Sequence, residues 1–391
     1  MSQVKLNIDE LKDFLGHMVK NNQFIQAQGK VPVAVNIEGE AGLGKTSSLM
    51  QLAKEMNMAV IKLNLSQIEE LGDLVGFPFK EFEVENKDGI KKWVQETLLE
   101  TYVKGGYRPT SQSRMSHASP EWIQGKGEGG FLILDDYTRA DQRFMQATME
   151  LIDRQEYISW KLPKNWHIVL TTNPDNGDYN VTSLDVAQKT RFISVEAKFD
   201  EKVWAKWAES AGIDGRCINF LLMNPEIISK SVNPRSLTTF FNSISSIQKF
   251  EDSLPIIQMI GEGSVGAEVS SMFTMFINNK LDKIISPHDI ITNQNEAYVI
   301  GALNSAVGQD DDFRADISSV IATRLINFCL THAETNSVPD AMISRIIKLV
   351  TDCGSFTDDL KYYMVKEIVN GNKVKFQKLM MNANVVKMTV K

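Results

Sequence analysis

The residues with the clearest chemical meaning form a short glycine-rich run. It satisfies the pattern G-x-x-x-x-G-K-[ST] and is followed by a serine: Gly39, Glu40, Ala41, Gly42, Leu43, Gly44, Lys45, Thr46 and Ser47. Glycines let successive backbone N–H groups point at phosphate oxygens, and a helix that begins there adds its positive dipole end. Lys45 is expected to reach the β and γ phosphates of ATP. The Thr46 hydroxyl is a hard oxygen ligand suited to Mg²⁺.

A second group of polar residues follows the apolar run FLIL at 131–134. Asp135 and Asp136 come directly after it, as in a Walker B motif, where a buried strand brings carboxylates to its carboxyl edge. We expect Asp135 to orient Mg²⁺ through its water shell. Asp136 takes the place of a glutamate that activates the attacking water, and its side chain is one methylene shorter. Two interpretations remain, a shifted water position or ATP binding with slow hydrolysis; we favour working but slow catalysis.

These residues need a scaffold, and the sequence indicates an α/β fold. Five short apolar runs are typical of strands buried in a parallel sheet: 31–39, 59–65, 131–134, 168–172 and 192–195. Helical or loop segments separate them, and apolar spacing predicts a further helix over 8–18. The expected core is therefore a five-stranded parallel P-loop sheet with helices on both faces.

The chain of 391 residues is too long for one compact core. We expect a nucleotide-binding core over 1–198, with insertions at about 79–130 that include a hairpin turning at 86–89. From about residue 200 helical periodicity takes over, for example in 200–212 and 234–250. The helical part is expected to comprise 199–290 and a C-terminal extension, 291–391.

Composition excludes several classes of protein. A net charge of -7 and a pI near 5.5 argue against a surface that binds nucleic acid over its whole extent. Cys217, Cys329 and Cys353 are odd in number and lack metal-ligand spacing, which argues against a disulfide framework or a zinc site and favours the cytoplasm. The N-terminal segment lacks the apolar run of a signal peptide or spanning helix, so we expect no membrane insertion.

Taken together, these motifs resemble the MoxR-like branch of AAA+ ATPases. The similarity extends over about residues 8–290 and includes the segment LNLSQIEELGDLVGFP at 63–78 and HIVLTTNP at 167–174. The segment DDYTRA at 135–140 is similar to the family's DEINRA, with Asp136 and Tyr137 as departures. The resemblance implies an AAA+ core followed by an all-α lid at 199–290.

The resemblance also implies roles for three residues outside the two motifs. Asn173 corresponds to the sensor 1 residue that holds the attacking water, although it could instead cap a turn before Pro174. Arg191 falls in the family's D-R-F motif, here with Thr190 in place of Asp, and would be an arginine finger acting on ATP of a neighbouring subunit. Arg235 corresponds to the sensor 2 arginine of the lid, or else is a surface arginine near a helix N-terminus.

The resemblance implies a homo-oligomeric ring, a hexamer, that remodels a protein partner. A von Willebrand factor A domain protein is the first candidate. Nucleic acid is the rival, because 102–108 and 114–117 combine cations with aromatic or imidazole rings and because 361–391 holds seven lysines and one glutamate. An ordinary solvated loop and lysine-rich terminal helix explain those features more simply, so nucleic acid is not favoured. An ATP-gated scaffold with little turnover is the third alternative.

Overall fold

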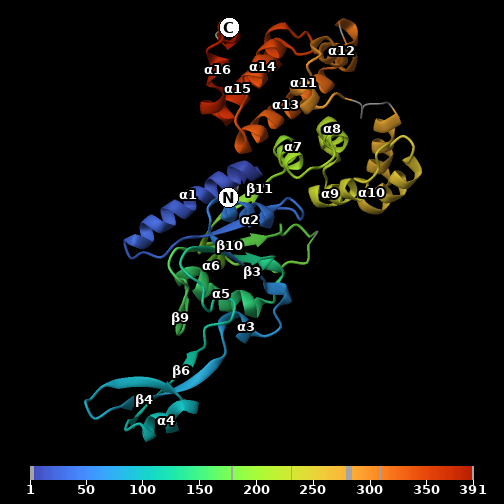
Figure 1. Cartoon of the computed structure of the whole chain (residues 1–391). Coiled ribbons are helices and arrows are strands. Elements are labelled where there is room, and N and C mark those ends of the chain that lie inside the picture. Colours follow the sequence, from blue (N-terminus) through green and yellow to red (C-terminus); the bar gives the residue numbers. More distant parts are fainter. Residues whose placement is uncertain (1–3, 178, 230, 279–283, 309, 390–391) are drawn as a thin grey trace. The chain divides into compact units, whose positions relative to one another are not determined.

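The computed structural model describes residues 4–177, 179–229, 231–278, 284–308 and 310–389. The chain divides into two compact units, Met1–Lys198 and Phe199–Lys391, which are coloured blue to green and green to red in Figure 1. Strands and helices alternate in the first unit, and the described part of the second unit is helical.

The first unit is built on a six-stranded sheet whose neighbouring strands are all parallel. The order is β1-β11-β2-β10-β7-β3. The strands are β1 (Lys5–Leu6), β2 (Ala34–Glu38), β3 (Ala59–Asn64), β7 (Gly130–Asp135), β10 (Trp166–Thr172) and β11 (Phe192–Ala197). The five longer strands confirm the predicted α/β P-loop core, and β1 is an addition at one edge. Because β10 lies between β2 and β7, the carboxyl ends of these three strands meet at the point where strand order reverses, which is where open α/β sheets bind ligands.

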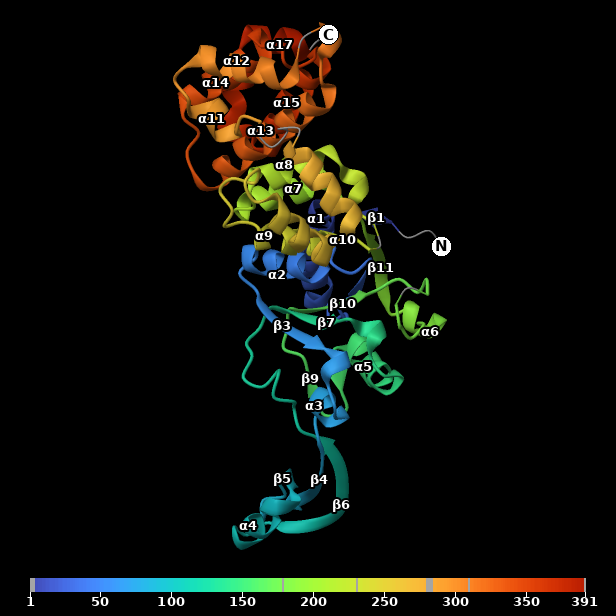
Figure 2. The same cartoon turned by 90° about the vertical axis from the view of Figure 1, so that its right-hand side faces the viewer.

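Alternate residues of the central strands supply the two cores of this unit. On β7, Phe131 and Ile133 pack in a cluster with α1 and α2, whereas Leu132 and Leu134 pack in a cluster with α3 and α5. Figures 1 and 2 show the sheet between these helices. The helices of the unit are α1 (Ile8–Ala27), α2 (Lys45–Glu55), α3 (Leu71–Val75), α4 (Leu99–Lys104), α5 (Gln142–Arg154) and α6 (Val186–Lys189).

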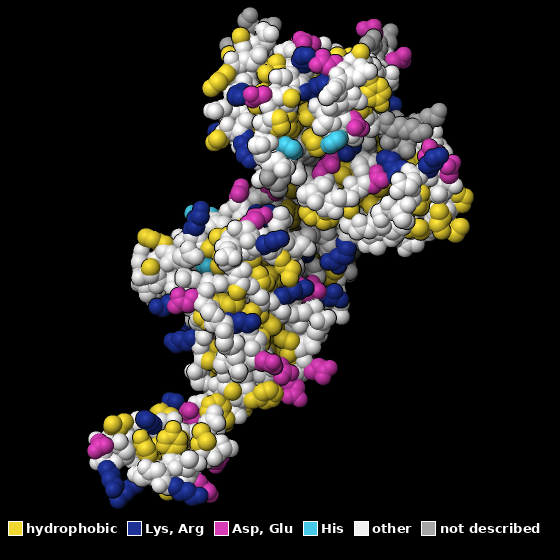
Figure 3. Space-filling view, viewed as in Figure 1, with side chains coloured by type: hydrophobic (Ala, Val, Ile, Leu, Met, Phe, Trp, Pro, Cys, Tyr) yellow, Lys and Arg dark blue, Asp and Glu magenta, His cyan; other side chains and the backbone are white. Residues whose placement is uncertain are grey.

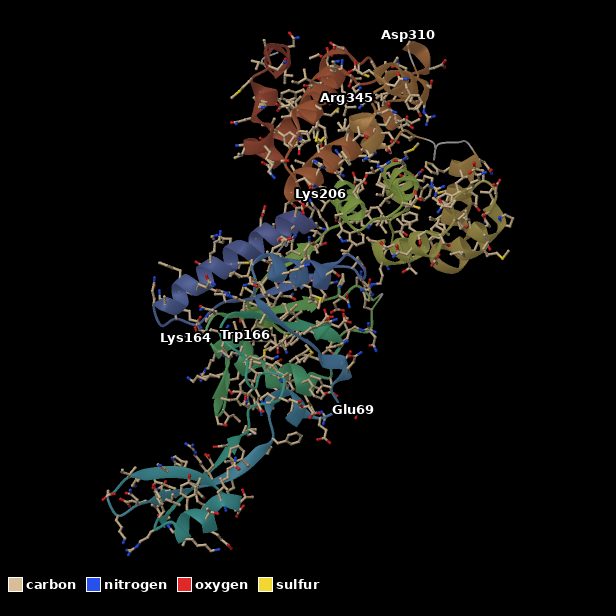
Figure 4. The ribbon with its side chains drawn as sticks, viewed as in Figure 1. Glu69, Lys164, Trp166, Lys206, Asp310 and Arg345 are labelled. Atoms are coloured by element: carbon tan, nitrogen blue, oxygen red, sulfur yellow. The ribbon has the colours of Figure 1, made fainter. Side chains whose placement is uncertain are left out.

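Trp166 closes the amino-terminal side of the α5 core. Its side chain is fully buried, and its indole N–H donates to the Gly127 carbonyl at 2.9 Å. Figure 4 shows Trp166 among the strands and Lys164 nearer the margin of the unit. A Cβ at Gly130 would lie 2.8 Å from the Trp166 ring, so the start of β7 has to be glycine for the ring to fit.

The insertion forms a separate three-stranded antiparallel sheet of order β5-β4-β6, drawn in cyan in Figure 1. The predicted hairpin is confirmed by β4 (Pro78–Glu85) and β5 (Lys91–Gln95), and the Asn86 side-chain oxygen accepts from the N–H of Asp88 and of Ile90 at 3.0 and 2.8 Å. The third strand, β6 (Arg108–His117), was not predicted from the sequence. A small hairpin, β8 (Glu156–Tyr157) and β9 (Trp160–Lys161), follows α5.

The second unit contains two hydrophobic clusters, one drawn from residues 204–277 and one from residues 290–385. Its helices are α7 (Glu201–Ser210), α8 (Gly215–Met223), α9 (Pro234–Ser243), α10 (Leu254–Asn278), α11 (Pro287–Thr292), α12 (Glu296–Val307), α13 (Ala315–Thr335), α14 (Asp340–Asp352), α15 (Asp358–Gly371), α16 (Lys373–Met380) and α17 (Ala383–Thr389). A break at Gly266, with φ of 83°, divides α10. Among the described residues, no helix combines the length and the apolar character needed to cross a membrane.

One helix is shorter than its pattern predicted. The periodicity of 234–250 indicates a single helix, but α9 ends at Ser243. Hydroxyl groups in the serine-rich stretch bond to nearby carbonyls, Ser243 to Thr239 at 2.8 Å and Ser245 to Asn242 at 2.8 Å. Such local bonds compete with helical hydrogen bonding and favour an early end.

Candidate functional site

The glycine-rich run lies at the carboxyl edge of the sheet, between β2 and the first turn of α2. Gly42 and Gly44 have φ of 82° and 87°, a left-handed conformation that favours glycine. Gly44 is the residue before the first turn of α2, which begins at Lys45. The loop therefore presents the N-terminus of an 11-residue helix at the switch point of the sheet, where backbone N–H groups and the helix dipole favour an anion.

Lys45 is buried inside this loop, with 8% of its surface exposed. Its ammonium group donates to the carbonyl oxygens of Gly39 and Glu40, the latter at 3.0 Å, and to the Asn173 side-chain oxygen at 3.4 Å. Oxygen acceptors thus hold the cation over the loop, close to where phosphate oxygens would bind.

Asp135, the last residue of β7, faces the phosphate loop. One carboxylate oxygen accepts from the hydroxyls of Thr46 at 2.6 Å and Thr171 at 2.7 Å, and the other pairs with the Lys62 ammonium at 2.8 Å. Burial alone would raise the pKa of Asp135, but the bonds from Lys62, Thr46 and Thr171 outweigh it and hold the pKa below its usual value. Asp135 is therefore an ionised carboxylate beside the Thr46 hydroxyl, and this pair of hard oxygen donors suits Mg²⁺.

Asp136 turns sharply away from the end of β7, with φ of 52° and ψ of 40°. Its N–H donates to the Thr171 hydroxyl at 3.1 Å, and its carboxylate accepts from the Asn173 amide nitrogen at 3.3 Å. Asn173 follows β10 directly and contacts Lys45 with its oxygen and Asp136 with its nitrogen. The arrangement is that of a P-loop ATPase site.

Ser47, the last residue of the predicted phosphate-binding run, is exposed on the first turn of α2. The next residue, Ser48, is buried and its hydroxyl donates to the Lys45 carbonyl at 2.7 Å. The described side-chain contacts at the site therefore involve Lys45 and Thr46 of this turn.

Arg191 is not part of this group, because it lies at the opposite edge of the sheet. Phe192 pairs with Ala34, five residues before Gly39, so the start of β11 is roughly 16 Å from the phosphate loop at about 3.3 Å per residue. Arg191 donates to the Ala187 carbonyl at 2.6 Å. A cavity of about 300 Å³ adjoins it and is lined by Val31, Pro32, Val33, Ile152, Asp153, Thr190, Arg191, Phe192 and Ile193.

Arg235 belongs to the second unit. It is exposed in the first turn of α9. Asn233 caps that helix by accepting from the Ser236 N–H at 3.0 Å, while its own N–H donates to the Ser236 hydroxyl at 3.1 Å. Arg235 therefore lies near a helix N-terminus, as predicted.

Sequence reasoning missed three residues that contact the site. Lys62 and Thr171 both bond to Asp135. The Tyr179 hydroxyl donates to the Glu40 carboxylate and accepts from the Ala41 N–H at 3.2 Å, within the phosphate loop. A lone lysine inside the apolar run 59–65 and the paired threonines of HIVLTTNP were visible signals, but nothing in the sequence singled out Tyr179.

Comparisons with known proteins find distant similarities. No protein-family model matches the chain. A stretch of 166 residues, 41% of the chain, is 25% identical to Midasin of Giardia intestinalis, and it spans 3% of that protein. A RuvB variant of Thermotoga maritima is 14% identical, with a TM-score of 0.37 over 85% of this chain and 99% of that one. A protein of Cytophaga hutchinsonii described as a candidate ATPase is 14% identical, with a TM-score of 0.32 over 81% and 80%. With TM-scores this low, the superpositions add nothing to the fold assignment, which rests on the strand order.

Proposed function

We propose that this chain is a Mg²⁺-dependent ATPase of the MoxR-like AAA+ type, which works as a ring of identical subunits and remodels or assembles a protein partner. The observation that carries the proposal is the meeting of Lys45, Asn173 and Asp136 at the carboxyl edge of one sheet. These residues come from three separate segments, and an ordinary glycine-rich turn needs none of them.

The phosphate loop, 39–47, binds the triphosphate. Backbone N–H groups and the α2 dipole attract the phosphate oxygens, and Lys45 exchanges its carbonyl partners for the β and γ phosphates. Thr46 and Asp135 hold Mg²⁺, for which their hydroxyl and carboxylate oxygens are suitable donors. The bound ion supplies positive charge to the phosphate oxygens as negative charge develops on them.

Asp136 and Asn173 act on the attacking water. The Asn173 amide fixes the Asp136 carboxylate and can hold a water between them, and Asp136 accepts the proton that the water loses. Because aspartate is shorter than the usual glutamate, we propose slow turnover. An ATP-gated scaffold is the limiting case of this proposal, in which hydrolysis is too slow to matter.

The remaining cations that act on the nucleotide come from outside the nucleotide-binding core of the same subunit. Arg191 lies roughly 16 Å along the strands from its own phosphate loop, which supports action on the nucleotide of a neighbouring subunit. We propose a hexameric ring in which Arg191 is that finger. Arg235 would act on the γ phosphate from a lid formed by 199–290, with 291–391 as a C-terminal extension. The three free, buried cysteines favour the cytoplasm as the compartment.

A protein partner fits the surface better than nucleic acid does. In the insertion, Arg114 is paired with Glu81 at 2.7 Å and lies over the Trp93 ring, and Lys91 is paired with Glu83 at 3.1 Å. Figure 3 shows both signs of charge interspersed over this insertion. Cations already neutralised by neighbouring carboxylates release few counterions on a phosphate backbone, so they favour nucleic acid little. A von Willebrand factor A domain protein remains the proposed class of partner, by resemblance.

The central proposal is tested by ATP binding and turnover in Lys45→Ala. Loss of both, with an unchanged circular dichroism spectrum, is expected because the Lys45 ammonium donates to oxygens of the phosphate loop itself. Lys54→Ala, an exposed lysine on the same helix, is the matched control and should behave as wild type. Normal ATP affinity and turnover in Lys45→Ala would contradict the proposal, and salt-sensitive binding of DNA or RNA would favour the rival substrate.

A further inference from the structure

The two carboxylate oxygens of Asp135 have different kinds of partner. One oxygen accepts from the hydroxyls of Thr46 and Thr171, which are neutral donors. The other oxygen lies 2.8 Å from the Lys62 ammonium. This second oxygen therefore already has a full positive charge against it.

Lys62 reaches Asp135 from the neighbouring strand. In the register of β3 and β7, Asn64 pairs with Asp135 and Lys62 pairs with Ile133, so Lys62 lies two residues before the carboxyl edge and its long side chain extends toward that edge. The preceding residue, Ile61, is buried, whereas the Lys62 side chain is 40% exposed. The ammonium can therefore move into solvent without disturbing the core.

We propose that Lys62 competes with the divalent metal ion for Asp135, a role that rests on the function proposed above. Lys62 neutralises the Asp135 carboxylate when no metal is bound, and it has to leave that oxygen when Mg²⁺ approaches. Two cations at one partly buried carboxylate repel each other strongly, because charges there are screened far less than in water. Lys62 consequently weakens metal affinity and stabilises the metal-free site.

An ordinary surface ion pair would behave differently. Exposed ion pairs contribute little to stability. Asp135 is not exposed, since only 8% of its surface is accessible, and the Lys62 ammonium lies 2.8 Å from one of its oxygens. Removing Lys62 should therefore change the affinity of Asp135 for a metal ion.

The test is binding of Mn²⁺, measured by electron paramagnetic resonance on the full chain with saturating ADP. Lys62→Met removes the charge at similar length and should tighten the Mn²⁺ dissociation constant several-fold. Lys62→Arg keeps the charge and should stay near wild type. Lys12→Met is the matched control, because Lys12 forms an ion pair with Glu55 at 2.7 Å in the same unit, away from Asp135, and it should leave Mn²⁺ binding unchanged.

The outcomes separate this inference from the proposed function. If wild type binds no more Mn²⁺ than Asp135→Asn does, the metal site itself is wrong. If wild type binds Mn²⁺ but Lys62→Met binds it equally or more weakly, Lys62 does not compete and the inference is overturned. A second measurement covers a variant that folds poorly: Mg²⁺ with ADP should raise the melting temperature more in Lys62→Gln than in wild type, because binding and stability are linked. An equal or smaller rise would likewise overturn it.

Discussion

The Thr46 hydroxyl donates a hydrogen bond of 2.6 Å to Asp135, which lies 89 positions further along the chain. The two residues belong to the α2 turn and to the end of β7, and β10 separates β7 from β2 in the sheet. Thr171 of β10 joins the same Asp135 oxygen at 2.7 Å. The phosphate loop and the carboxylate are therefore connected through the protein's own side chains, on the side of the site that is proposed to bind the metal ion.

Replacing Thr46 should separate metal-dependent from metal-independent binding. Thr46→Val keeps the size of the side chain but removes the hydroxyl, and we expect at least a ten-fold loss of ATP affinity in the presence of Mg²⁺. In excess chelator the affinity should change little, because the loop N–H groups remain. Titration of a fluorescent ATP analogue measures both, and Thr46→Ser should restore wild-type behaviour. Equal losses with and without Mg²⁺ would mean that Thr46 does not bind the metal.

Asp136→Asn should bind ATP but lose hydrolysis. The amide keeps the shape of the side chain and cannot accept a proton, so turnover should fall by roughly 100-fold or more. Phosphate release under saturating ATP gives the rate, and equilibrium binding gives the affinity. Asp13→Asn, an exposed position on α1, is the control. Undiminished turnover in Asp136→Asn would show that another group activates the water.

The parallel sheet and the phosphate site were predictable because their signals are local. Apolar runs buried on both faces and the glycines of the loop are read directly from consecutive residues. The contacts of Lys62 and Tyr179 were not predictable, although Lys62 stands out in its apolar run, because they depend on strand register and on the path of the loop after Asn173. The strand at 108–117 was missed for a related reason: its polar sequence has little apolar alternation, and pairing with β4 defines it.

His167 should make the folded state less stable as pH falls. It is 3% exposed on β10, its Nδ1 lies 3.4 Å from the Asn22 amide nitrogen, and burial lowers its pKa from 6.5 to about 4. Between these values the unfolded chain binds the proton more tightly, so stability is present above about pH 6.5 and is lost progressively toward pH 4. The loss approaches about 3 kcal/mol at about 1.4 kcal/mol per pKa unit.

Urea unfolding of wild type and His167→Gln between pH 7 and pH 4.5 measures this effect. The variant should show a clearly smaller decrease over that range. Asp135 does not contribute to this pH dependence. Its pKa is lowered in the folded state, so its contribution to stability is lost only below its usual value of 3.8. Parallel pH profiles for the two proteins would show that His167 is not the group responsible.

Tyr179→Phe should weaken ATP binding without unfolding the protein. The hydroxyl accepts the Ala41 N–H and donates to Glu40, so its loss leaves the outer half of the phosphate loop less ordered. One to two neutral or charge-assisted hydrogen bonds correspond to a roughly three- to ten-fold weaker dissociation constant. Isothermal titration measures it, and Tyr362→Phe, an exposed tyrosine on α15, is the control. Unchanged affinity would restrict Tyr179 to a structural role.

Arg191 is predicted to act between subunits, and this prediction follows from its place at the amino edge of the sheet. Phe192 pairs with Ala34, so the whole length of β2 separates Arg191 from the phosphate loop of its own chain. Arg191→Ala should therefore lower turnover by at least ten-fold while ATP binding changes little, because the finger contributes only as charge leaves the γ phosphate. ATP should also promote a ring in wild type, which light scattering coupled to gel filtration detects.

Mixing inactive subunits gives the sharper test. In a ring assembled from Arg191→Ala and Lys45→Ala chains, some interfaces join an intact phosphate loop on one subunit to an intact arginine on the next. Those interfaces should recover part of the wild-type turnover, although neither variant has it alone. The ratio of the two chains should matter, with the greatest recovery near equal amounts, because isolated variants of either kind form no complete interface.

Recovery requires that the mixed subunits assemble, so assembly is measured on the same samples. If mixed rings form and remain inactive, Arg191 does not act in trans. If Arg191→Ala hydrolyses ATP at the wild-type rate, it is not the finger at all. Arg154→Ala, which removes a cation from the last turn of α5 in the same unit, should leave turnover unchanged and shows that losing one arginine is not by itself enough.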